Sequence, residues 1–231
     1  MEKIALITGG ARRVGREICL HLAQQGWKIA VHYNNSEREA KSLKAEIDNI
    51  SRCIVIQKNF KNLSGFSSFL KKIEHDIGTP NLLINNASAF VNDKFVAVTE
   101  EKLESHFHVN CFAPLLLAQE FIKLNPSRET NIINIIDSSI DTYSNKFFSY
   151  TLSKKSLLEI TKNLAINLAP RCRVNAISPS FVMKADGQSE ASFEQSISSS
   201  PLKIATKVMD ICNVIDTILA VKSMTGSNIT I

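Results

Sequence analysis

The sequence predicts an α/β protein, a doubly wound Rossmann fold with a seven-stranded parallel sheet and helices on both faces. Short, β-prone apolar runs alternate along the whole chain with amphipathic stretches of helical length. Strands that alternate with helices pair in parallel, and the helices cover both faces of the sheet. The first apolar run also ends at a glycine-rich turn that opens a helical pattern. With 231 residues, 44% of them hydrophobic, the chain can bury one core, so we predict a single domain over residues 1–231.

The boundaries of the expected elements come from apolar spacing and from residues that begin or end helices. Gly26, Gly78 and Pro170 each follow a helical pattern, Ser36 is a plausible N-cap, and Pro114 predicts a kink inside a long helix. We expect strands at 3–7, 28–33, 53–57, 81–84, 131–136, 173–177 and 228–231. We expect helices at 14–25, 36–50, 66–77, 100–124, 149–168 and 207–221.

One stretch breaks the alternation of strands and helices. Residues 178–200 are rich in Ser, Gly and Glu, with Asp186-Gly187 in the middle. This composition predicts a loop, with room for a short helix inside it. Because it follows the sixth strand of a doubly wound sheet, we expect residues 178–206 to form a substrate loop or lid over the ligand crevice.

Composition excludes several classes of function. The net charge is +5, but the basic residues are spread along the chain, so we expect no nucleic-acid partner. Apolar runs fall short of the roughly 18 residues that a membrane span needs, and the first is too short for a signal peptide. The five cysteines lie far apart without a Cys-x-x-Cys pair, which favours reduced, mostly buried thiols in a cytoplasmic protein.

We also predict no metal site, because the sequence has no His, Cys and carboxylate residues at ligand spacing. The scattered histidines are interpreted as surface or core residues: His21, His75, His106 and His108.

The turn between the first strand and the first helix is the candidate phosphate site. There a helix N-terminus presents free N–H groups that a dinucleotide pyrophosphate can accept. Gly9 allows the sharp turn, Gly15 allows close helix–sheet packing, and Arg13-Val14 lies between them. Any strand–helix turn can hold glycines. The motif indicates dinucleotide binding chiefly because it lies at the start of a chain of alternating strands and helices.

The end of the second strand indicates which dinucleotide is bound. It carries His32-Tyr33-Asn34-Asn35-Ser36, with no acidic residue to hold an adenosine ribose 2′-hydroxyl. A 2′-phosphate would meet no repulsion there, and Asn35, Ser36 and nearby arginines can donate to it. We therefore expect NADPH. The same residues also suit a simple turn and N-cap, and both interpretations can hold together.

Tyr150 and Lys154 are four residues apart on the expected helix, so the phenol and the ammonium share one face. A neighbouring lysine favours the phenolate, which predicts a lowered tyrosine pKa and a better proton donor near neutral pH. Tyr-x-x-x-Lys is common by chance, and without support it would indicate only an amphipathic helix.

These motifs together resemble the short-chain dehydrogenase/reductase family. The resemblance rests on the turn at 8–15, on Asn85-Asn86-Ala87 after the fourth strand, on the Tyr150/Lys154 pair, and on Pro179 after the sixth strand. The resemblance covers essentially the whole chain, and the order and spacing of the motifs are specific to the family.

Within the family the sequence is most similar to pteridine reductases and bacterial dihydromonapterin (dihydrofolate-type) reductases. Arg13 replaces the central glycine of the turn, and Phe90 stands where that branch has an aromatic that stacks on the pterin. Asp137 lies thirteen residues before Tyr150, where most of the family has its catalytic serine. If this segment is aligned with the family pattern one or two positions later, Ser138 or Ser139 takes the place of the catalytic serine instead.

The resemblance implies an NADPH-dependent oxidoreductase that reduces a dihydropterin, such as dihydromonapterin, dihydrobiopterin or dihydrofolate, to its tetrahydro form. Tyr150 would supply the proton, Lys154 would bind the nicotinamide ribose, and Asp137 would accept from the pterin or share a proton with Tyr150. Phe90 would stack on the pterin, and Arg13 would reach the phosphates and a pterin edge. Phe90 could instead be a core aromatic.

Asn110 resembles the helix asparagine with which the family holds a water connected to the lysine, although it could simply cap or kink the helix near Pro114. Asn59 stands where the family usually has an adenine-binding aspartate, and Ser180 where it often has glycine. The implied cofactor-binding residues are Gly9, Arg13, Val14, Gly15, His32, Tyr33, Asn34, Asn35, Ser36, Asn59, Phe60, Asn86, Ala87, Ser88, Lys154, Pro179 and Ser180.

The sequence ends at Ile231, where relatives usually continue with Asp-Gly-Gly and a few residues at a subunit interface. We expect a homo-oligomer, a dimer or a tetramer, whose geometry could therefore differ. Two alternatives stay open. One is an NADPH-dependent carbonyl reductase such as a 3-ketoacyl reductase, and the other is a non-catalytic NADP-binding protein.

Overall fold

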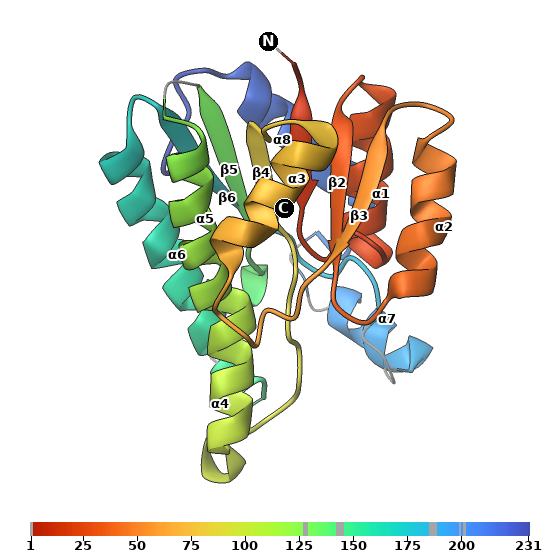
Figure 1. Ribbon diagram of the computed structural model, residues 1–231. Helices are drawn as coiled ribbons and strands as arrows, with labels where there is room; N and C mark the ends of the chain where they lie inside the picture. The colour runs from red at the N-terminus through yellow and green to blue at the C-terminus, as the bar shows by residue number, and fades with distance from the viewer. Residues whose placement is uncertain (1, 127–128, 142–145, 185–188, 199, 201) are drawn as a thin grey trace.

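The computed structural model describes residues 2–126, 129–141, 146–184, 189–198, 200 and 202–231 (Figure 1). The strands are β1 (Ile4–Ile7), β2 (Lys28–Tyr33), β3 (Cys53–Gln57), β4 (Leu82–Asn85), β5 (Thr130–Ile135), β6 (Cys172–Ser178) and β7 (Asn228–Thr230). The α-helices are α1 (Arg13–Gln24), α2 (Glu37–Ile47), α3 (Phe66–Ile77), α4 (Glu100–Phe107), α5 (Ala113–Leu124), α6 (Phe148–Leu168), α7 (Glu190–Ser198) and α8 (Val208–Ala220). Short 3₁₀ turns cover Phe95–Ala97 and Ser138–Asp141.

Within the described residues, seven strands form one parallel sheet in the order β3-β2-β1-β4-β5-β6-β7. The chain winds outward from β1 to β3, crosses back, and continues from β4 to β7 on the other side. The switch point of the winding therefore lies between β1 and β4, where a doubly wound sheet leaves a crevice at its carboxyl edge. The predicted fold class is confirmed.

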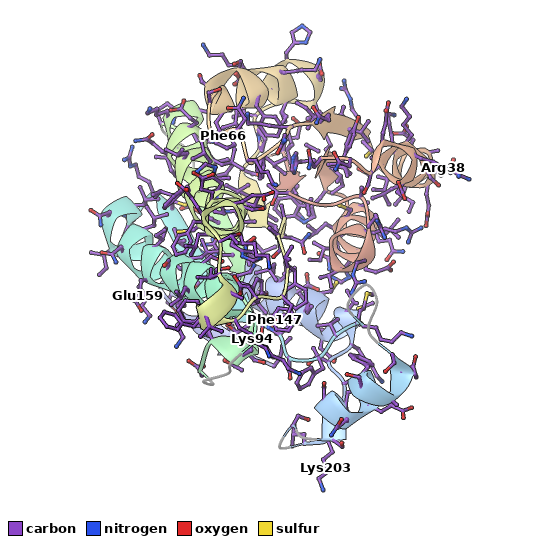
Figure 2. All side chains as sticks on the ribbon, turned by 90° about the horizontal axis from the view of Figure 1, so that it is seen from below. Arg38, Phe66, Lys94, Phe147, Glu159 and Lys203 are labelled. Atoms are coloured by element: carbon purple, nitrogen blue, oxygen red, sulfur yellow. The ribbon has the colours of Figure 1, made fainter. Side chains whose placement is uncertain are left out.

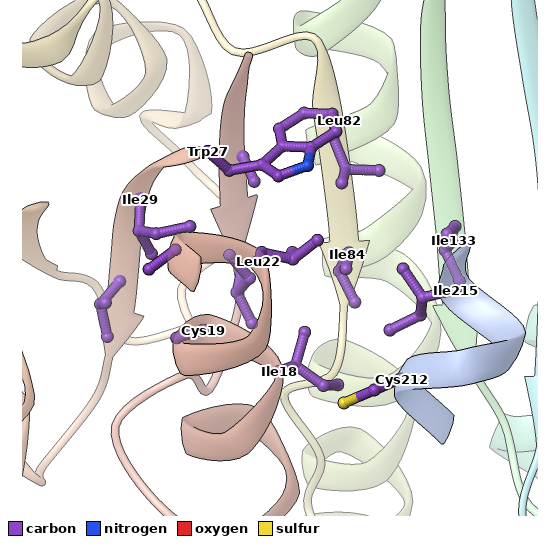
Figure 3. Close-up of a cluster of buried hydrophobic side chains, with 14 of the residues drawn as sticks. Ile18, Cys19, Leu22, Trp27, Ile29, Leu82, Ile84, Ile133, Cys212 and Ile215 are labelled. Carbon is purple, nitrogen blue, oxygen red and sulfur yellow. The ribbon is translucent and has the colours of Figure 1, made fainter. Parts of the chain in front are cut away.

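Two hydrophobic cores lie on the two faces of the sheet. One is formed by the apolar faces of α1, α2 and α8, with Ile18, Leu22 and Ile215 packed against strand residues such as Ile84 (Figure 3). The other lies under α3, α5 and α6. The central strand β1 is buried along its whole length, as its uninterrupted apolar run predicts. These two cores fix the strand ends from which the site residues project.

The long helix predicted over 100–124 is divided in two. A π-helical turn, His108–Phe112, joins α4 to α5. Pro114 has no backbone N–H, and its ring would clash with the carbonyl of residue 110 in a continuous α-helix, so the preceding turn widens. The kink predicted at Pro114 is thus present, and it takes the form of a π turn that contains the buried Asn110.

Other boundaries differ slightly from the predictions. Helix α2 ends at Ile47 rather than near 50, and Ser36 occupies the N-cap position without a capping side-chain hydrogen bond. Of the predicted lid, residues 185–188, 199 and 201 lie outside the described residues, and α7 lies within the rest. In Figure 1, α4 and α7 both lie at the carboxyl edge of the sheet. No helix in the described ranges is long and apolar enough to cross a membrane.

Candidate active site

The crevice at the switch point is closed at its base by a hydrogen-bonded clamp between the ends of β1 and β4. Thr8 Oγ1 accepts from the backbone N–H groups of Asn86 and Ala87, at 3.0 Å each. The Asn86 side-chain amide donates to the carbonyls of Thr8 and Gly9, also at 3.0 Å. The predicted cofactor residues Asn86 and Ala87 therefore hold the turn in place.

Gly9 and Gly15 occupy positions that no other residue fits. Gly9 has φ +61°, and a Cβ there would lie 2.8 Å from the Ala87 Cα. A Cβ on Gly15 would lie 2.3 Å from the Gly9 carbonyl oxygen and 2.6 Å from Asn86 Nδ2. The turn, the start of α1 and the end of β4 thus meet backbone to backbone, which leaves the N-terminal amides of α1 facing the crevice.

Arg13 is the first residue of α1, and it has φ +53° where the usual fingerprint has a glycine. Its guanidinium donates to the carbonyl of Lys184 at 2.5 Å and more weakly to that of Met183 at 3.4 Å. Arg13 therefore links the phosphate turn directly to the segment that follows β6. Its first-turn neighbours Val14 and Gly15 complete the predicted phosphate turn.

His32 and Phe60, both predicted to bind the cofactor, lie beneath the crevice. Both side chains are buried, and their rings stack at 4.0 Å with an interplanar angle of 5°. His32 Nδ1 accepts from the Gly9 N–H at 3.1 Å, and Nε2 bonds the Lys58 carbonyl at 2.8 Å. The two buried side chains pack into the core, and His32 supports the turn from below through its hydrogen bond with Gly9. That His32 and Phe60 bind the cofactor stays a prediction.

At the end of β2, Asn34 and Asn35 are exposed, and Tyr33 and Ser36 are half-buried. This part of the strand end is accessible from the crevice side of the sheet. Asn59 Oδ1 accepts from the Lys61 N–H at 2.9 Å, which leaves one lone pair of the amide oxygen for another donor.

His32 makes folding stability depend on pH. Burial lowers its pKa from 6.5 to about 4, so the folded chain keeps it neutral. Below pH 6.5 the unfolded chain takes up a proton that the folded chain does not, so stability falls until about pH 4 and then levels off. The difference of 2.5 pH units corresponds to about 3 kcal/mol.

Urea unfolding of the wild type and His32→Gln at several pH values between 7 and 4 measures this effect. Because carboxylates titrate in both proteins, the prediction concerns the difference between them: the wild type should lose about 3 kcal/mol more than the variant. Parallel curves for wild type and His32→Gln would contradict the role of His32.

Tyr150 and Asp137 form the central pair of the site. The Tyr150 hydroxyl donates to Asp137 Oδ2 at 2.7 Å, and the other carboxylate oxygen accepts from the Ser139 N–H at 2.8 Å. Tyr150 lies in the first turn of α6, and Asp137 directly follows β5. The backbone N–H of Ser138 donates to the Pro179 carbonyl. Of the three residues that the register left open, Asp137 is the one that contacts the phenol.

The expected lowering of the Tyr150 pKa is wrong. Burial raises this pKa well above 10, and the adjacent Asp137 carboxylate raises it further. Lys154 does share the face of Tyr150, with Nζ 5.9 Å from the ring centroid, but at that distance its effect is smaller. Tyr150 therefore carries its proton throughout the neutral range, as a proton donor must.

Lys154 is buried, and its ammonium donates to the Ile135 carbonyl at 2.8 Å. Burial lowers its pKa to about 8, against the opposing attraction of Asp137. A lysine with this pKa is still mostly charged at neutral pH, and the β5 carbonyl fixes its orientation.

Phe90 lies on the open side of this pair. Its side chain is 45% exposed, so it is not a core aromatic. The Phe90 ring stacks on the Phe147 ring, with 4.5 Å between the ring centroids and an interplanar angle of 7°. The Tyr150 ring makes a T-shaped contact with Phe90, with 4.7 Å between the centroids. Phe147 itself has φ +54°, an unusual backbone conformation just before α6. Together the three rings form an aromatic wall beside the Tyr150 hydroxyl.

Asn110 lies in the π turn, and its link through a water to Lys154 stays a prediction. Its side-chain oxygen accepts from the Ala89 N–H at 2.7 Å, and its amide donates to the Ala89 carbonyl and to Ser153 Oγ at 2.9 and 3.0 Å. The two contacts with Ala89 fix the loop after β4, and the contact with Ser153 joins the π turn to α6. The side chain is therefore a support for the residues next to Phe90.

The remaining predicted residues lie at the rim of the site. Ser88 Oγ donates to the Ala89 carbonyl, the Pro179 carbonyl accepts from Ser138, and the Ser180 N–H donates to the Ile231 carbonyl. Across the described residues, no group of three or more His, Cys, Asp or Glu side chains is arranged to hold a metal ion. All five cysteines are free and buried.

Comparison with known proteins identifies the arrangement. A family model described as short chain dehydrogenase matches residues 3–195. The chain belongs to the short-chain dehydrogenase family. It is accordingly an oxidoreductase of that family, and the resemblance inferred from its motifs is confirmed.

Among solved members of this family, FolM alternative dihydrofolate reductase 1 from Brucella canis, complexed with NADP, is 34% identical. The match has a TM-score of 0.94 and covers 99% of this chain and 91% of that one. The dihydromonapterin reductase of Klebsiella pneumoniae is 27% identical over 224 residues, 96% of this chain and 91% of its own length. The 3-oxoacyl-[acyl-carrier-protein] reductase FabG of Staphylococcus aureus is 26% identical over 220 residues, 93% and 89% of the two chains.

Sequence reasoning missed the residues that support this short-chain dehydrogenase site from behind. His106 is a core residue, as one of the two interpretations predicts, and it also bonds the loop that carries Phe90 and the start of α6. Phe147 was not considered, although an aromatic pair just before Tyr150 was a visible signal. Thr8 was seen only as part of the turn, and its hydroxyl proves to join the ends of β1 and β4.

Proposed function

We propose that this short-chain dehydrogenase is an NADPH-dependent reductase that reduces a dihydropterin, such as dihydromonapterin, dihydrobiopterin or dihydrofolate, to the tetrahydro form. The observation that carries the proposal is the 2.7 Å hydrogen bond from the Tyr150 hydroxyl to the Asp137 carboxylate. A carboxylate beside the proton donor suits a heterocycle that has N–H and amino donors, whereas a simple ketone has none for it to accept. The relatives named dihydromonapterin reductase and dihydrofolate reductase support the same class.

The residues present fit NADPH. Gly9 and Gly15 lie in a turn with no room for a Cβ at either position, and the first turn of α1 carries the basic Arg13. Gly9, Arg13, Val14 and Gly15 would hold the diphosphate. Asn34, Asn35 and Ser36 would donate to the 2′-phosphate, with no acidic residue among them. When bound, the cofactor supplies the hydride.

The chain's own residues supply orientation and the proton. A hydride added to the carbon of a C=N bond leaves the neighbouring nitrogen in need of a proton, which the protonated Tyr150 hydroxyl would donate or relay from water. Asp137 would accept from the 2-amino and N3 side of the pterin, and the buried Lys154 would bind the nicotinamide ribose hydroxyls. Phe90 would stack on the bicycle, which contributes about 0.5–1.5 kcal/mol beyond area burial.

Turnover assays separate this proposal from its alternatives. Purified protein is mixed with NADPH and either a dihydropterin or an acetoacetyl thioester, and absorbance of the reduced cofactor is followed. We expect oxidation with the dihydropterin. Turnover of the thioester alone would favour a carbonyl reductase, like the FabG relative, and tight NADPH binding without any turnover would favour a non-catalytic protein.

Replacing Asp137 tests the residue on which the substrate class rests. In Asp137→Ser the phenol keeps a hydroxyl partner, but the anionic acceptor is lost. We expect kcat/KM for a dihydropterin to fall at least tenfold, the equivalent of one charge-assisted hydrogen bond of roughly 1.5–3 kcal/mol. Reduction of a small ketone should fall much less. Equal losses on the two substrates would contradict the role proposed for Asp137.

A further inference from the structure

Behind the aromatic wall, His106 on α4 lies in a buried chain of hydrogen bonds. Val91 N–H bonds His106 Nε2 at 3.1 Å, and His106 Nδ1 lies 2.6 Å from Ser149 Oγ. Ser149 Oγ in turn donates to Asp93 Oδ2, and the Ser149 N–H donates to Asp93 Oδ1 at 3.1 Å. His106 and Ser149 are inaccessible to solvent, and Asp93 is nearly so.

The direction of every hydrogen bond in this chain is fixed by its two ends. A backbone N–H can only donate, so His106 Nε2 must be the unprotonated nitrogen. Nδ1 then carries the proton and donates to Ser149 Oγ, whose own proton goes to the Asp93 carboxylate. His106 must be neutral for this arrangement, because a proton on Nε2 would face the Val91 N–H.

The chain connects the Phe90 loop to the first turn of the catalytic helix. Asp93 accepts from the N–H of Ser149, the second residue of α6, and so acts as the cap that Phe147 does not provide. Figure 2 shows the labelled Phe147 and Lys94 close together, where the Asp93 carbonyl accepts from the Phe148 N–H. These hydrogen bonds therefore join the Phe90 loop to the first turn of α6.

Phe90 is held from both sides by α4 and the π turn that follows it. His106 holds the residue after Phe90, and Asn110, four positions further on, holds the residue before it. The Phe90 ring contacts the rings of Phe147 and Tyr150. The position of its ring relative to the phenol thus depends on the backbone at 89 and 91.

We propose that His106, in its neutral Nδ1–H form, is a positioning residue that holds the Phe90 ring against Tyr150 and so sets the affinity for a flat substrate. This inference rests on the proposed function, because a planar ring is what Phe90 would stack on. The groups that face His106 are the Asp93 carboxylate through Ser149, the Lys102 ammonium on its own helix, and the Tyr150 ring at 6.1 Å.

The balance of these groups keeps His106 neutral. Burial lowers its pKa below 6.5, Asp93 opposes that shift, and Lys102 reinforces it. Protonation of His106 Nε2 at acid pH turns the acceptor of the Val91 N–H into a donor. The hydrogen bond that holds the backbone after Phe90 is then lost. The affinity for a flat substrate should therefore weaken below the His106 pKa, whereas NADPH affinity should not follow this group.

Nuclear magnetic resonance of the wild type tests the support without any substrate. In ¹⁵N-histidine spectra His106 should carry its proton on Nδ1 at neutral pH and should titrate below 6.5. The Val91 amide should be protected from hydrogen exchange at neutral pH and lose protection as His106 titrates. A proton on Nε2, or a Val91 amide that exchanges freely at neutral pH, would overturn the inference.

Two substitutions at His106 then show whether this residue acts through its hydrogen bonds or only by filling space in the core. His106→Leu removes the acceptor, and KM for the dihydropterin should rise about tenfold while kcat and the NADPH Kd stay within twofold. His106→Gln offers an oxygen near the position of Nε2 but does not titrate, so KM should recover near neutral pH and its rise at acid pH should disappear. The exposed His75→Gln should retain the wild-type profile.

A wild-type KM in a folded His106→Leu, or a rise of KM at acid pH that persists in His106→Gln, would overturn the role of His106. Absence of dihydropterin turnover in the wild type would overturn the proposed function instead. In that case the tautomer of the His106 ring and the hydrogen exchange of the Val91 amide still decide whether His106 holds the Phe90 loop.

Discussion

Tyr150→Phe is expected to lower dihydropterin turnover by about 10²- to 10⁴-fold, the range that a positioned general acid contributes. The phenyl ring keeps the contacts with Phe90 and with Lys154, and it removes only the oxygen that bonds Asp137. Because the Tyr150 pKa is raised by burial and by Asp137, the hydroxyl is protonated before the reaction begins. Its loss therefore removes a proton that is already in place.

The effect should appear in kcat and not in cofactor affinity. NADPH Kd, measured by fluorescence titration, should stay close to the wild-type value, since the turn at 8–15 lies on different elements. Ser156→Ala is a matched control on the same helix, because this exposed hydroxyl bonds only the Leu152 carbonyl at 3.0 Å. If Tyr150→Phe retained more than a tenth of turnover, the proton would have to come from elsewhere.

Gly15→Ala is expected to abolish cofactor binding under ordinary assay conditions, with NADPH affinity reduced at least 100-fold. The new Cβ would lie 2.3 Å from the Gly9 carbonyl and 2.9 Å from the Gly10 Cα, and backbone atoms cannot rotate out of the way. The start of α1 must then move away from the turn, which separates the amides that would face the diphosphate. Overpacking of this kind also costs about 3 kcal/mol of stability.

Gly26→Ala distinguishes this clash from a general effect of replacing a glycine. Gly26 has φ +81°, but a Cβ there meets nothing within 4 Å. The backbone conformation should cost roughly 1–2 kcal/mol in stability while NADPH affinity stays at the wild-type level. Isothermal titration and urea unfolding of the two variants measure both quantities. Gly15→Ala with normal NADPH affinity would contradict the close packing of the turn.

The sequence was informative where function depends on spacing along one element or at a strand end. The separation of thirteen positions from Asp137 to Tyr150 selected the residue that bonds the phenol, and the turn at Gly9 and Gly15 followed from their place at the junction of β1 and α1. Both inferences use local geometry, which a sequence records directly.

What the sequence could not provide was the environment of each group. Lys154 suggested a lowered Tyr150 pKa, but the direction is set by burial and by the Asp137 carboxylate, which lies after the end of β5. The sequence does not show whether the His32 ring lines the crevice or lies beneath it. The packing of His32 against Phe60 places the ring beneath the turn. His106 could not be recognised because its partners, Val91 and Ser149, come from two other segments.

The five buried thiols have a consequence for studying this enzyme in solution. Burial raises the pKa of Cys53 to about 12 and those of Cys111, Cys172 and Cys212 to about 11, and it also raises the pKa of Cys19 well above its ordinary value. Alkylating reagents attack the thiolate, so they react only after the chain opens and exposes these side chains. Pulsed alkylation followed by mass spectrometry therefore counts opening events, and the cysteines serve as built-in reporters spread over both layers of helices and the sheet between them.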